Sequence, residues 1–336
     1  MENNILEFKY FLKKPRKIVI TTHTRPDADA LGSSLSLLLF LQKKGHQAHV
    51  ITPTSYPAFL NWMPQNSQVL IYTDDEEKAH SLIDEADCIV CNDFSSLNRI
   101  DAMGDIVRKS PVPKVLIDHH LEPEEFATYQ LWDPMASSTC ELIFRLIDEF
   151  DEKSLIDKDM ASCVYAGIMT DTGSFRFPST SKAVHLILAE LYETGIDHSA
   201  IHRLIYDNNK LSRLRLLGYA LSEKLIVFED LNTALISLNE QELKRFNYEQ
   251  GDTEGIVNYA LSVSGIVFAA IIMEKDGMVK FSFRSVGDFN VSKFAKTHFN
   301  GGGHKNAAGG RSDLEYDATI KKFKSILPDY KDELLF

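Results

Sequence analysis

The sequence lacks an apolar run long enough to cross a bilayer, and it lacks a recognisable secretory leader. Its longest apolar stretch, residues 35–41, contains a serine and stops at Gln42, whereas a membrane-spanning helix needs about 20 apolar residues. The first ten residues show no basic segment followed by an apolar one, so no secretory signal is expected. These absences predict a cytoplasmic protein without a membrane partner.

Positive charge is also scarce. Lysine and arginine total 36 against 48 aspartate and glutamate residues, which gives a formal net charge of −12. Proteins that bind long nucleic acids usually present a basic surface, because neutralisation of phosphates dominates their affinity. An acidic protein can still bind a small phosphate ligand if metals and a few basic side chains supply local positive charge. The charge argues against long nucleic acid as a partner and leaves small phosphorylated ligands open.

Cysteine is rare as well. The four cysteines are Cys88, Cys91, Cys140 and Cys163, and their spacing is not typical of a disulfide framework. Cys88 and Cys91 form a C-x-x-C motif, but they lie in an apparent strand and no second pair accompanies them. Buried, reduced thiols are the favoured interpretation. Zinc binding or redox chemistry is the alternative.

The chain is long enough for two domains, and its first half alternates between strand and helix patterns. Strands are predicted at residues 17–23, 46–52, 69–74, 87–93 and 115–120, with helices at 30–44 and 97–109. This alternation predicts an α/β fold with a mostly parallel sheet covered on both faces. The pattern then becomes almost wholly helical, with predicted helices at 138–150, 159–171, 182–195, 198–207 and 211–224.

Strand patterns resume in the last third of the chain and predict a smaller α+β unit. The predicted strands are 225–230, 233–239, 265–277 and 278–285, and the predicted helices are 255–263, 291–298 and 320–326. The sequence Lys275-Asp276-Gly277 is typical of a hairpin turn between the last two strands. We therefore expect an N-terminal domain over residues 1–195, a helical bridge over 196–224 and a C-terminal domain over 225–336.

Four of the apolar runs end in side chains that are typical of metal ligands. We call the residues at the end of each run its exit. The four exits are His23 with Asp27 and Asp29, then Asn92-Asp93, then Asp118-His119-His120, and finally Thr170-Asp171. The carboxyl ends of parallel strands share one edge of a sheet, where ligands bind. Side chains that are distant in sequence should therefore converge there. The fourth run is more helical than strand-like, but its Asp171 would sit at an equivalent exit.

The chemistry of these side chains favours a pair of divalent cations. Carboxylate oxygens suit hard cations such as Mn²⁺ or Mg²⁺, and imidazole suits a transition metal, so Mn²⁺ is favoured over Mg²⁺ and over structural zinc. Two metals about 3.5–4 Å apart can bind a phosphoryl group and activate a water molecule. Asp27 and Asp29 could serve one metal each, with Asp93 between the metals.

Each exit alone also has an ordinary structural explanation. Asp27 and Asp29 could cap the following helix, and Asp93 could be a turn residue. His119 and His120 could be half-buried histidines, and Asp171 could end a helix. The occurrence of four such exits on one chain favours the metal site.

A glycine-rich segment, NGGGHKNAAGG over residues 300–310, follows one of the helix patterns. Glycines permit positive φ and close approach of the backbone to a ligand, and exposed N–H groups in a loop suit an anion. His304 and Lys305 lie inside this predicted loop. Arg284 ends the preceding predicted strand, where its guanidinium could contact a phosphate. A mobile glycine-rich turn is the alternative.

Assembled, these motifs resemble the DHH phosphoesterase family, in the subfamily with a C-terminal DHHA1 domain. The sequence is similar in particular to the bacterial nanoRNase and phosphoadenosine phosphate phosphatase branch, through essentially the whole chain. Residues 23–33, 92–93, 118–120 and 170–175 resemble the four motifs of the catalytic domain. Residues 283–285 and 301–310 resemble the substrate-binding elements of the DHHA1 domain.

The resemblance implies a role for each residue. His23 and Asp27 would bind one Mn²⁺, Asp29 and His119 the other, with Asp93 bridging and Asp171 completing the set. Catalysis would involve Asp93 and also His120, which would contact the scissile phosphate, while Asp118 would orient its neighbours. The far end of the substrate would be held by Arg284, Ser285, Gly301, Gly302, Gly303, His304 and Lys305.

The expected activity is hydrolysis of oligoribonucleotides of a few units and of the 3′-phosphate of phosphoadenosine phosphate. Long nucleic acid is not expected as a substrate, and a homodimer is compatible with the apolar helices. Three alternatives remain open. The substrate could be a linear dinucleotide from cyclic-dinucleotide turnover, or it could be pyrophosphate or polyphosphate. The protein could also be a non-catalytic nucleotide sensor on the same fold.

Overall fold

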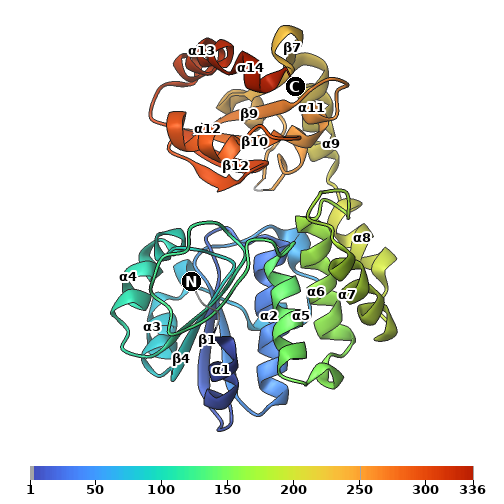
Figure 1. Cartoon of the computed structure of the whole chain (residues 1–336). Helices are drawn as coiled ribbons and strands as arrows, with labels where there is room; N and C mark the ends of the chain where they lie inside the picture. Colours follow the sequence, from blue (N-terminus) through green and yellow to red (C-terminus); the bar gives the residue numbers. More distant parts are fainter. Residues whose placement is uncertain (1–3, 250, 336) are drawn as a thin grey trace. The chain divides into compact units, whose positions relative to one another are not determined.

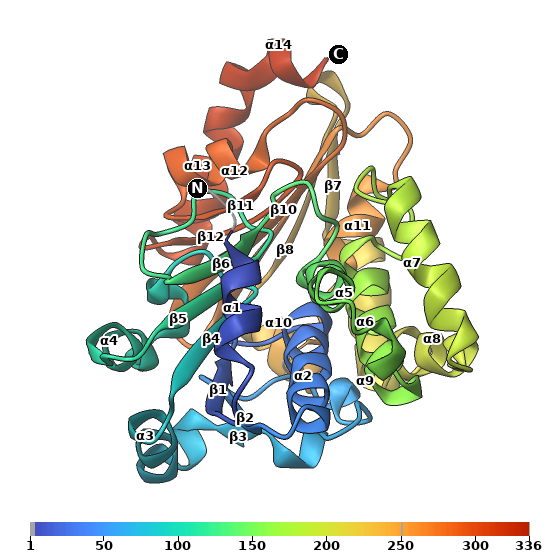
Figure 2. The same cartoon turned by 60° about the horizontal axis from the view of Figure 1, so that its bottom comes forward.

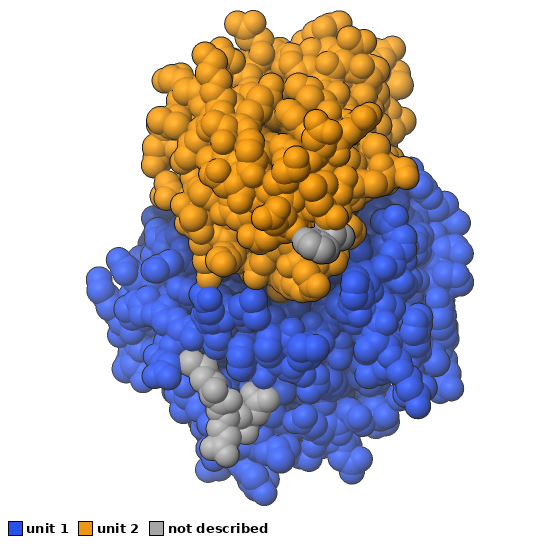
Figure 3. Space-filling model, turned by 45° about the horizontal axis from the view of Figure 1, so that its top comes forward, with its two compact units in different colours: residues 1–208 blue, residues 209–336 orange. Residues whose placement is uncertain are grey.

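The computed structural model describes residues 4–249 and 251–335, which form two compact units divided between Asn208 and Asn209 (Figure 3). The predicted helical bridge over residues 196–224 spans this division. Helix α8 (His198–Tyr206) belongs to the first unit and α9 (Leu211–Tyr219) to the second. Within the described residues, no helix combines the length and the apolar character that crossing a membrane requires.

The first unit is built on a sheet of six parallel strands. These are β1 (Lys17–Thr21), β2 (Gln47–Thr52), β3 (Leu70–Ile71), β4 (Cys88–Asn92), β5 (Lys114–Asp118) and β6 (Tyr129–Trp132). Their spatial order is β3-β2-β1-β4-β5-β6, and every neighbouring pair is parallel. The order reverses between β1 and β4, and such a switch point is where ligands bind in open α/β sheets. The predicted parallel sheet is confirmed, although β6 was not predicted.

Helices cover both faces of this sheet, as predicted (Figures 1 and 2). The helices are α1 (Ile5–Phe11), α2 (Ala28–Lys43), α3 (Glu76–Asp84), α4 (Ala102–Lys109), α5 (Thr139–Glu149), α6 (Lys158–Asp171), α7 (Lys182–Glu193) and α8. Helices α2, α5 and α6 build the larger core on one face, and α3 and α4 build a smaller one on the other. The predicted helix over residues 97–109 is broken at Asp101, whose φ of 46° ends a short 3₁₀ turn before α4 begins.

The four cysteines are free and buried. Cys88 belongs to the larger core and Cys91 to the smaller one, on the opposite face of the sheet. Residues three apart in a strand point to opposite faces, so these two thiols cannot join in one metal or redox site. The C-x-x-C motif is therefore part of the packing of β4.

The second unit contains a mixed sheet with the order β11-β12-β10-β9-β8-β7. Its strands are β7 (Leu225–Phe228), β8 (Thr233–Leu238), β9 (Phe268–Lys275), β10 (Met278–Ser285), β11 (Gly302–His304) and β12 (Ala307–Ser312). Its helices are α9, α10 (Glu240–Arg245), α11 (Ile256–Leu261), α12 (Val291–His298), α13 (Tyr316–Ile326) and α14 (Lys331–Leu334). The predicted hairpin between β9 and β10 is confirmed, because Asp276 and Gly277 both have positive φ, at 52° and 70°.

The glycine-rich segment is a strand pair and not the predicted loop. Residues 302–304 and 307–312 form β11 and β12, which extend the sheet beyond β10. A Cβ atom at Gly301 would lie 2.1 Å from the carbonyl oxygen of Gly309, and one at Gly303 would lie 2.5 Å from that of Ala307. Two of the three consecutive glycines are therefore required by the close approach of backbone to backbone. A Cβ at Gly302 would meet only the Lys296 side chain, at 3.6 Å.

Candidate metal centre

The carboxyl ends of the central strands bring the predicted ligands together inside the first unit. His23 follows β1, Asp93 directly follows β4, and His119 follows β5. The six predicted ligands form two groups, His23 with Asp27 and Asp93, and Asp29 with His119 and Asp171. Within each group the candidate ligand atoms all lie within 4.8 Å of one another. Two adjacent groups that could each hold a metal ion, each with one imidazole, thus lie at the switch point of the sheet.

Asp93 is shared between the two groups. Its Oδ2 lies 3.4 Å from Nε2 of His23, and its Oδ1 lies 3.5 Å from Nε2 of His119. Its side chain is buried, and its backbone has a φ of 63°. A left-handed conformation at a residue other than glycine costs free energy, and it is found where surrounding structure imposes it, often at functional sites. The turn at Asp93 aims one carboxylate oxygen at each group.

The spacing of these atoms fits ligands that share a cation. The other nitrogen–oxygen distances are 3.4 Å from His119 to Asp171, 3.8 Å from His119 to Asp29 and 3.9 Å from His23 to Asp27. These distances exceed those of good hydrogen bonds. Two atoms that each lie about 2.1 Å from one ion are separated by about 3.0 Å at an angle of 90° and by about 3.4 Å at 109°. The donor set therefore suits two divalent cations.

Backbone carbonyls orient both imidazoles. Nδ1 of His23 lies 2.8 Å from the carbonyl oxygen of Thr24, and Nδ1 of His119 lies 3.3 Å from that of Ala136. A carbonyl oxygen can only accept a hydrogen bond, so Nδ1 carries the proton in each ring. Nε2 of each ring then faces the carboxylates, which is the orientation that metal-binding histidines adopt.

The N-terminus of α5 holds the buried carboxylate of Asp29. The backbone N–H of Thr139 donates to Oδ2 at 2.6 Å, and that of Cys140 donates to Oδ1 at 2.8 Å. The hydroxyl of Thr139 also donates to Oδ1 of Asp93 at 2.9 Å. Thr139 thus binds two predicted ligands, Asp93, which is shared between the two groups, and Asp29, which belongs to one group only. Sequence reasoning missed this residue.

We expect Thr139→Val to weaken metal binding by about tenfold to a hundredfold, as is typical when a partner of a ligand is removed. Valine keeps the shape and the backbone N–H, but Asp93 loses the hydroxyl that fixes Oδ1. Calorimetric titration of the chelator-treated protein with Mn²⁺ measures the change. Thr194→Val is the matched control, since among the described residues the Thr194 hydroxyl bonds only to the carbonyl oxygen of Leu191, at the end of α7. Equal affinities in the two variants would contradict a role for Thr139.

Asp27 caps a helix with one carboxylate oxygen and leaves the other free to face His23. Its Oδ1 accepts hydrogen bonds from the backbone N–H groups of Asp29 and Ala30, both at 3.0 Å, and so caps α2. Its Oδ2 is turned toward His23. Because a carboxylate has two oxygens, capping the helix and binding a metal are compatible.

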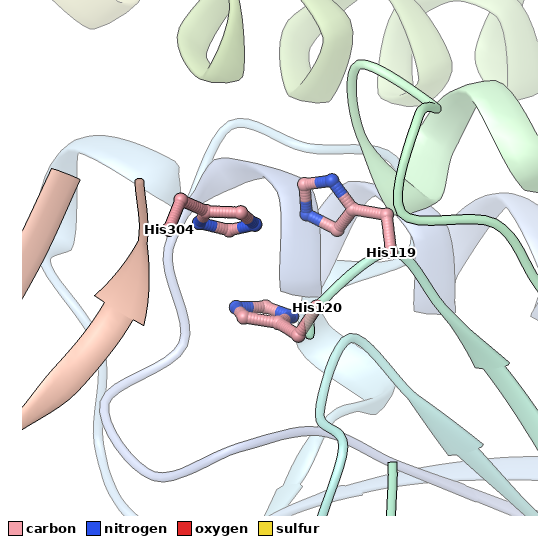
Figure 4. A group of neighbouring side chains, drawn as sticks. All are labelled: His119, His120 and His304. Carbon is pink, nitrogen blue, oxygen red and sulfur yellow. The ribbon is translucent and has the colours of Figure 1, made fainter. Parts of the chain in front are cut away.

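His120 and Asp118 form a hydrogen-bonded pair beside the predicted ligands. Nδ1 of His120 lies 2.7 Å from Oδ1 of Asp118, whose side chain is fully buried. The ring of His120 stands nearly edge-on to that of His119, with centroids 4.9 Å apart (Figure 4). The indole N–H of Trp132, at the end of β6, donates to the backbone carbonyl of His120 at 2.7 Å. Asp118 and Trp132 therefore fix the orientation of His120.

The site holds more negative charge than its own imidazoles can neutralise. Burial, reinforced by the nearby Asp93 carboxylate, raises the pKa of Asp29 to about 7. Burial and the charges of Asp29 and Asp27 also raise the pKa of Asp171 well above its usual value. Burial alone would raise the pKa of Asp93, but His119 and His23 outweigh it and hold that pKa well below the usual value. Added positive charge would allow all of the carboxylates to ionise.

The predicted substrate residues of the second unit lie near the β10–β12 strands. Arg284 and His304 are placed on these strands by the sheet register. The buried hydroxyl of Ser285 donates to the carbonyl oxygen of Phe289 at 2.7 Å, and Nζ of Lys305 pairs with Asp288 at 2.7 Å. Ser285 and Lys305 therefore also stabilise the segment between β10 and α12. Their contact with a substrate stays a prediction.

Comparison with known proteins gives matches along most of the chain. The profile described as DHH family, N-terminal domain, matches residues 17–168, and that of the DHHA1 domain matches residues 233–329. The "probable bifunctional oligoribonuclease and PAP phosphatase NrnA" of Streptococcus mutans is 30% identical over 321 residues, covering 91% of this chain and 93% of the other. The "bifunctional oligoribonuclease and PAP phosphatase NrnA" of Thermus thermophilus is 29% identical, covering 94% and 90%. Among solved structures, an exopolyphosphatase-related protein from Bacteroides fragilis superposes with a TM-score of 0.94 at 44% identity, covering 98% and 97%.

Proposed function

The chain belongs to the DHH family of phosphoesterases, and we propose that it hydrolyses very short oligoribonucleotides and the 3′-phosphate of phosphoadenosine phosphate. The observation that carries this proposal is the shared carboxylate of Asp93, which presents one oxygen to each of two His–Asp groups. Relatives named for both activities span nearly the whole chain. The reaction would be metal-dependent hydrolysis of a phosphate ester.

The residues divide naturally between two cations. His23, Asp27 and Asp93 would hold one, and Asp29, His119 and Asp171 would hold the other with Asp93 between them. When bound, such a pair supplies positive charge for a phosphoryl group and acidifies a water molecule. All six ligands are present, which supports an enzyme over a non-catalytic nucleotide sensor. An imidazole in each group supports Mn²⁺ over Mg²⁺.

His120 would act directly on the scissile phosphate. An ionised carboxylate can only accept a hydrogen bond, so the proton on Nδ1 is directed at Asp118. Nε2 is then the atom that faces the substrate. When protonated, Nε2 would donate to a phosphoryl oxygen and stabilise the charge that develops there. The fixed ring orientation means that no reorganisation is needed at that step.

The second unit would bind the part of the substrate remote from the scissile phosphate. Arg284 and His304 are the residues we propose for this. Gly302 is proposed with them, because a Cβ atom there would not clash with the protein backbone, so this glycine is the one that close approach of a ligand would explain. The net charge of −12 disfavours a continuous groove for a long strand. Short ligands with few phosphates are therefore the proposed substrates.

Substrate length tests the proposal. With Mn²⁺, we expect kcat/KM for di- to pentaribonucleotides to exceed that for a twenty-four-mer by on the order of ten- to a hundredfold, because a longer strand has no basic surface to follow. Phosphoadenosine phosphate should release inorganic phosphate under the same conditions. A linear diadenylate in the panel detects the alternative substrate from cyclic-dinucleotide turnover. Equal rates for short and long RNA would contradict the proposed length preference.

A further inference from the structure

Arg99 is a half-buried cation beside the candidate metal centre. It lies in the 3₁₀ turn Leu97–Ile100, which follows the shared ligand Asp93 at the end of β4. Its backbone carbonyl accepts a hydrogen bond at 2.9 Å from the N–H of Thr24, the residue after His23. The turn after β4 is thereby joined to the loop after β1, which carries the first of the two metal groups.

Among the residues that the structure describes, none pairs with the guanidinium of Arg99. The side chain is half-buried, yet within that part of the chain it makes no hydrogen bond and no ion pair. A charge that is partly removed from water without a partner is unfavourable. An anionic ligand would remove that cost.

The charge of Arg99 acts on the first metal group. Burial lowers the pKa of His23, the carboxylates of Asp93 and Asp27 raise it, and Arg99 lowers it, with a net shift upward. Charges in salt solution are largely screened beyond about 10 Å. The guanidinium therefore lies near the imidazole of His23, in agreement with the backbone hydrogen bond to Thr24.

The turn that carries Arg99 is held in place on two sides. Oε2 of Glu124 accepts hydrogen bonds from the hydroxyl of Ser96 and from the N–H of Leu97, both at 3.0 Å. A Cβ atom at Gly104, in α4, would lie 2.3 Å from the carbonyl oxygen of Leu97, so the helix packs directly on the turn. A fixed backbone lowers the cost of placing the guanidinium on a ligand.

Two other arginines, Arg25 and Arg176, follow predicted ligands closely in the sequence, but both are exposed. Water can solvate an exposed charge, so their surroundings do not require an anionic partner. Nε of Arg176 also donates to the carbonyl oxygen of Gly173 at 2.7 Å. Of the three, Arg99 is the one whose burial calls for a ligand.

The charges of the loaded centre leave Arg99 for the substrate. The predicted ligands are four aspartates and two histidines, and two divalent cations would balance the four ionised carboxylates while the imidazoles stay neutral. No excess negative charge would then remain among the ligands for Arg99 to offset. A phosphoryl group that enters the site is the remaining anion, and a guanidinium can donate two parallel hydrogen bonds to its oxygens.

From the joining of the Arg99 turn to the loop after β1, we infer that Arg99 is a further catalytic residue, which binds a non-bridging oxygen of the scissile phosphate. The inference rests on the proposed function, because the phosphate is that of the proposed substrates. Arg99 would act from beside His23, and His120 from the exit of β5. As negative charge develops on the phosphoryl oxygens, the contact strengthens, so Arg99 would lower the barrier to hydrolysis.

The test compares Arg99→Gln and Arg99→Lys with the wild type. Binding of inorganic phosphate to the Mn²⁺-loaded full chain is measured by calorimetric titration, which needs no turnover. We expect the Kd for phosphate to rise about tenfold to a hundredfold in Arg99→Gln, as is typical for the loss of a hydrogen bond to a charged group. Arg99→Lys keeps the charge but lacks the planar fork, so its Kd should be intermediate.

Two further measurements separate a phosphate contact from a merely structural role. For a dinucleotide, kcat/KM should fall about a hundredfold to a thousandfold in Arg99→Gln, mainly through kcat, as when one donor to a developing charge is removed. The affinity for Mn²⁺, titrated into the chelator-treated variant, should not weaken, because removal of a nearby cation favours a bound cation. A turn that merely supports the ligands would lose metal affinity instead.

Lys109→Gln is the matched control. Lys109 is exposed at the end of α4, the helix that follows the same turn, and the 8 residues of this helix span about 12 Å. The change removes one positive charge from the same segment at a distance from the turn. Its phosphate affinity and its rate should match those of the wild type.

Any of four results would exclude Arg99 as a phosphate ligand. These are unchanged phosphate affinity in Arg99→Gln, a parallel loss of Mn²⁺ affinity, an equal loss in Lys109→Gln, or a Mn²⁺-loaded wild type that does not bind phosphate. A wild type that binds phosphate but hydrolyses neither dinucleotide nor phosphoadenosine phosphate would contradict the proposed function instead. The phosphate titration would still test Arg99 in that case.

Discussion

Asp93→Asn is expected to lower kcat/KM for dinucleotides by about a thousandfold or more, which corresponds to a loss of about 4 kcal/mol of transition-state stabilisation. Asparagine has nearly the same shape as aspartate, but it has no charge and only one acceptor oxygen. Asp93 uses both oxygens, one toward His23 and one toward His119. An amide can serve only one of the two groups, so bound metal should fall from two ions per chain to one or fewer. Elemental analysis of the purified variant measures this directly.

The matched control for this variant is Asp87→Asn. Asp87 lies at the opposite, amino end of β4, where its Oδ2 accepts a hydrogen bond from the backbone N–H of Lys17 at 2.8 Å. This change should leave activity and metal content near the wild-type values. If the Asp93 variant kept both metals and a rate within about tenfold of wild type, Asp93 would not be the shared ligand. If the wild type itself bound phosphoadenosine phosphate without turnover, the protein would be a sensor.

The positions of the predicted ligands could be foreseen because each depends on short-range sequence. An apolar run that ends in polar residues marks the carboxyl end of a strand, and a parallel sheet places such ends along one edge. This reasoning placed His23, Asp93 and His119 correctly at the exits of β1, β4 and β5. It left the choice between cap and ligand open at Asp27, where the structure places one carboxylate oxygen on the N-terminus of α2 and turns the other toward His23.

The residues that position the ligands could not be foreseen, because their contacts are distant in sequence. Thr139 meets Asp29 across 110 residues, and no local pattern reports that approach. Trp132 belongs to β6, a four-residue strand in which only Leu131 is buried, so it lacks the apolar run that marks a strand. Trp132 nonetheless fixes the backbone of His120.

The glycine-rich segment shows a different limit of sequence reasoning. Glycine enrichment predicts freedom of the backbone, but it does not tell whether a ligand or another strand occupies the space. At Gly301 and Gly303 the neighbour is the backbone of β12.

Removal of the metals is expected to destabilise the first unit, and more strongly at pH 8 than at pH 5.5. Free metal at about 1,000 times its Kd stabilises a protein by about 4 kcal/mol, which for a unit of this size corresponds to a rise in Tm of about 8–16 °C. Tm measured by calorimetry with Mn²⁺ and with chelator gives the difference at each pH.

The pH dependence follows from the protons that the metal-free site retains. In the unfolded chain, aspartate titrates near pH 3.9, but in the folded metal-free unit the pKa of Asp29 is raised to about 7 and that of Asp171 is also raised. Between these values the folded state binds protons that the unfolded chain has lost, so the free energy of unfolding falls as pH rises. The pKa of His119 is raised well above 6.5, since nearby carboxylates outweigh the effect of burial. Protonated His119 therefore stabilises the folded unit fully below the pKa that histidine has in the unfolded chain. This stabilisation is lost as the pH rises through the pKa of His119 in the folded unit.

Metal ions compete with these protons, because only the ionised carboxylates and the neutral imidazoles bind a cation. The metal-free Tm should therefore fall from pH 5.5 to 8, and the rise in Tm on adding Mn²⁺ should grow over the same interval. Asp29→Asn removes the carboxyl that titrates near pH 7, so this variant should show a shallower metal-free slope and a smaller rise with Mn²⁺. A Tm shift that is the same at both pH values would mean that the buried carboxylates are ionised without a cation. The two His–Asp groups would then need another source of neutralising charge.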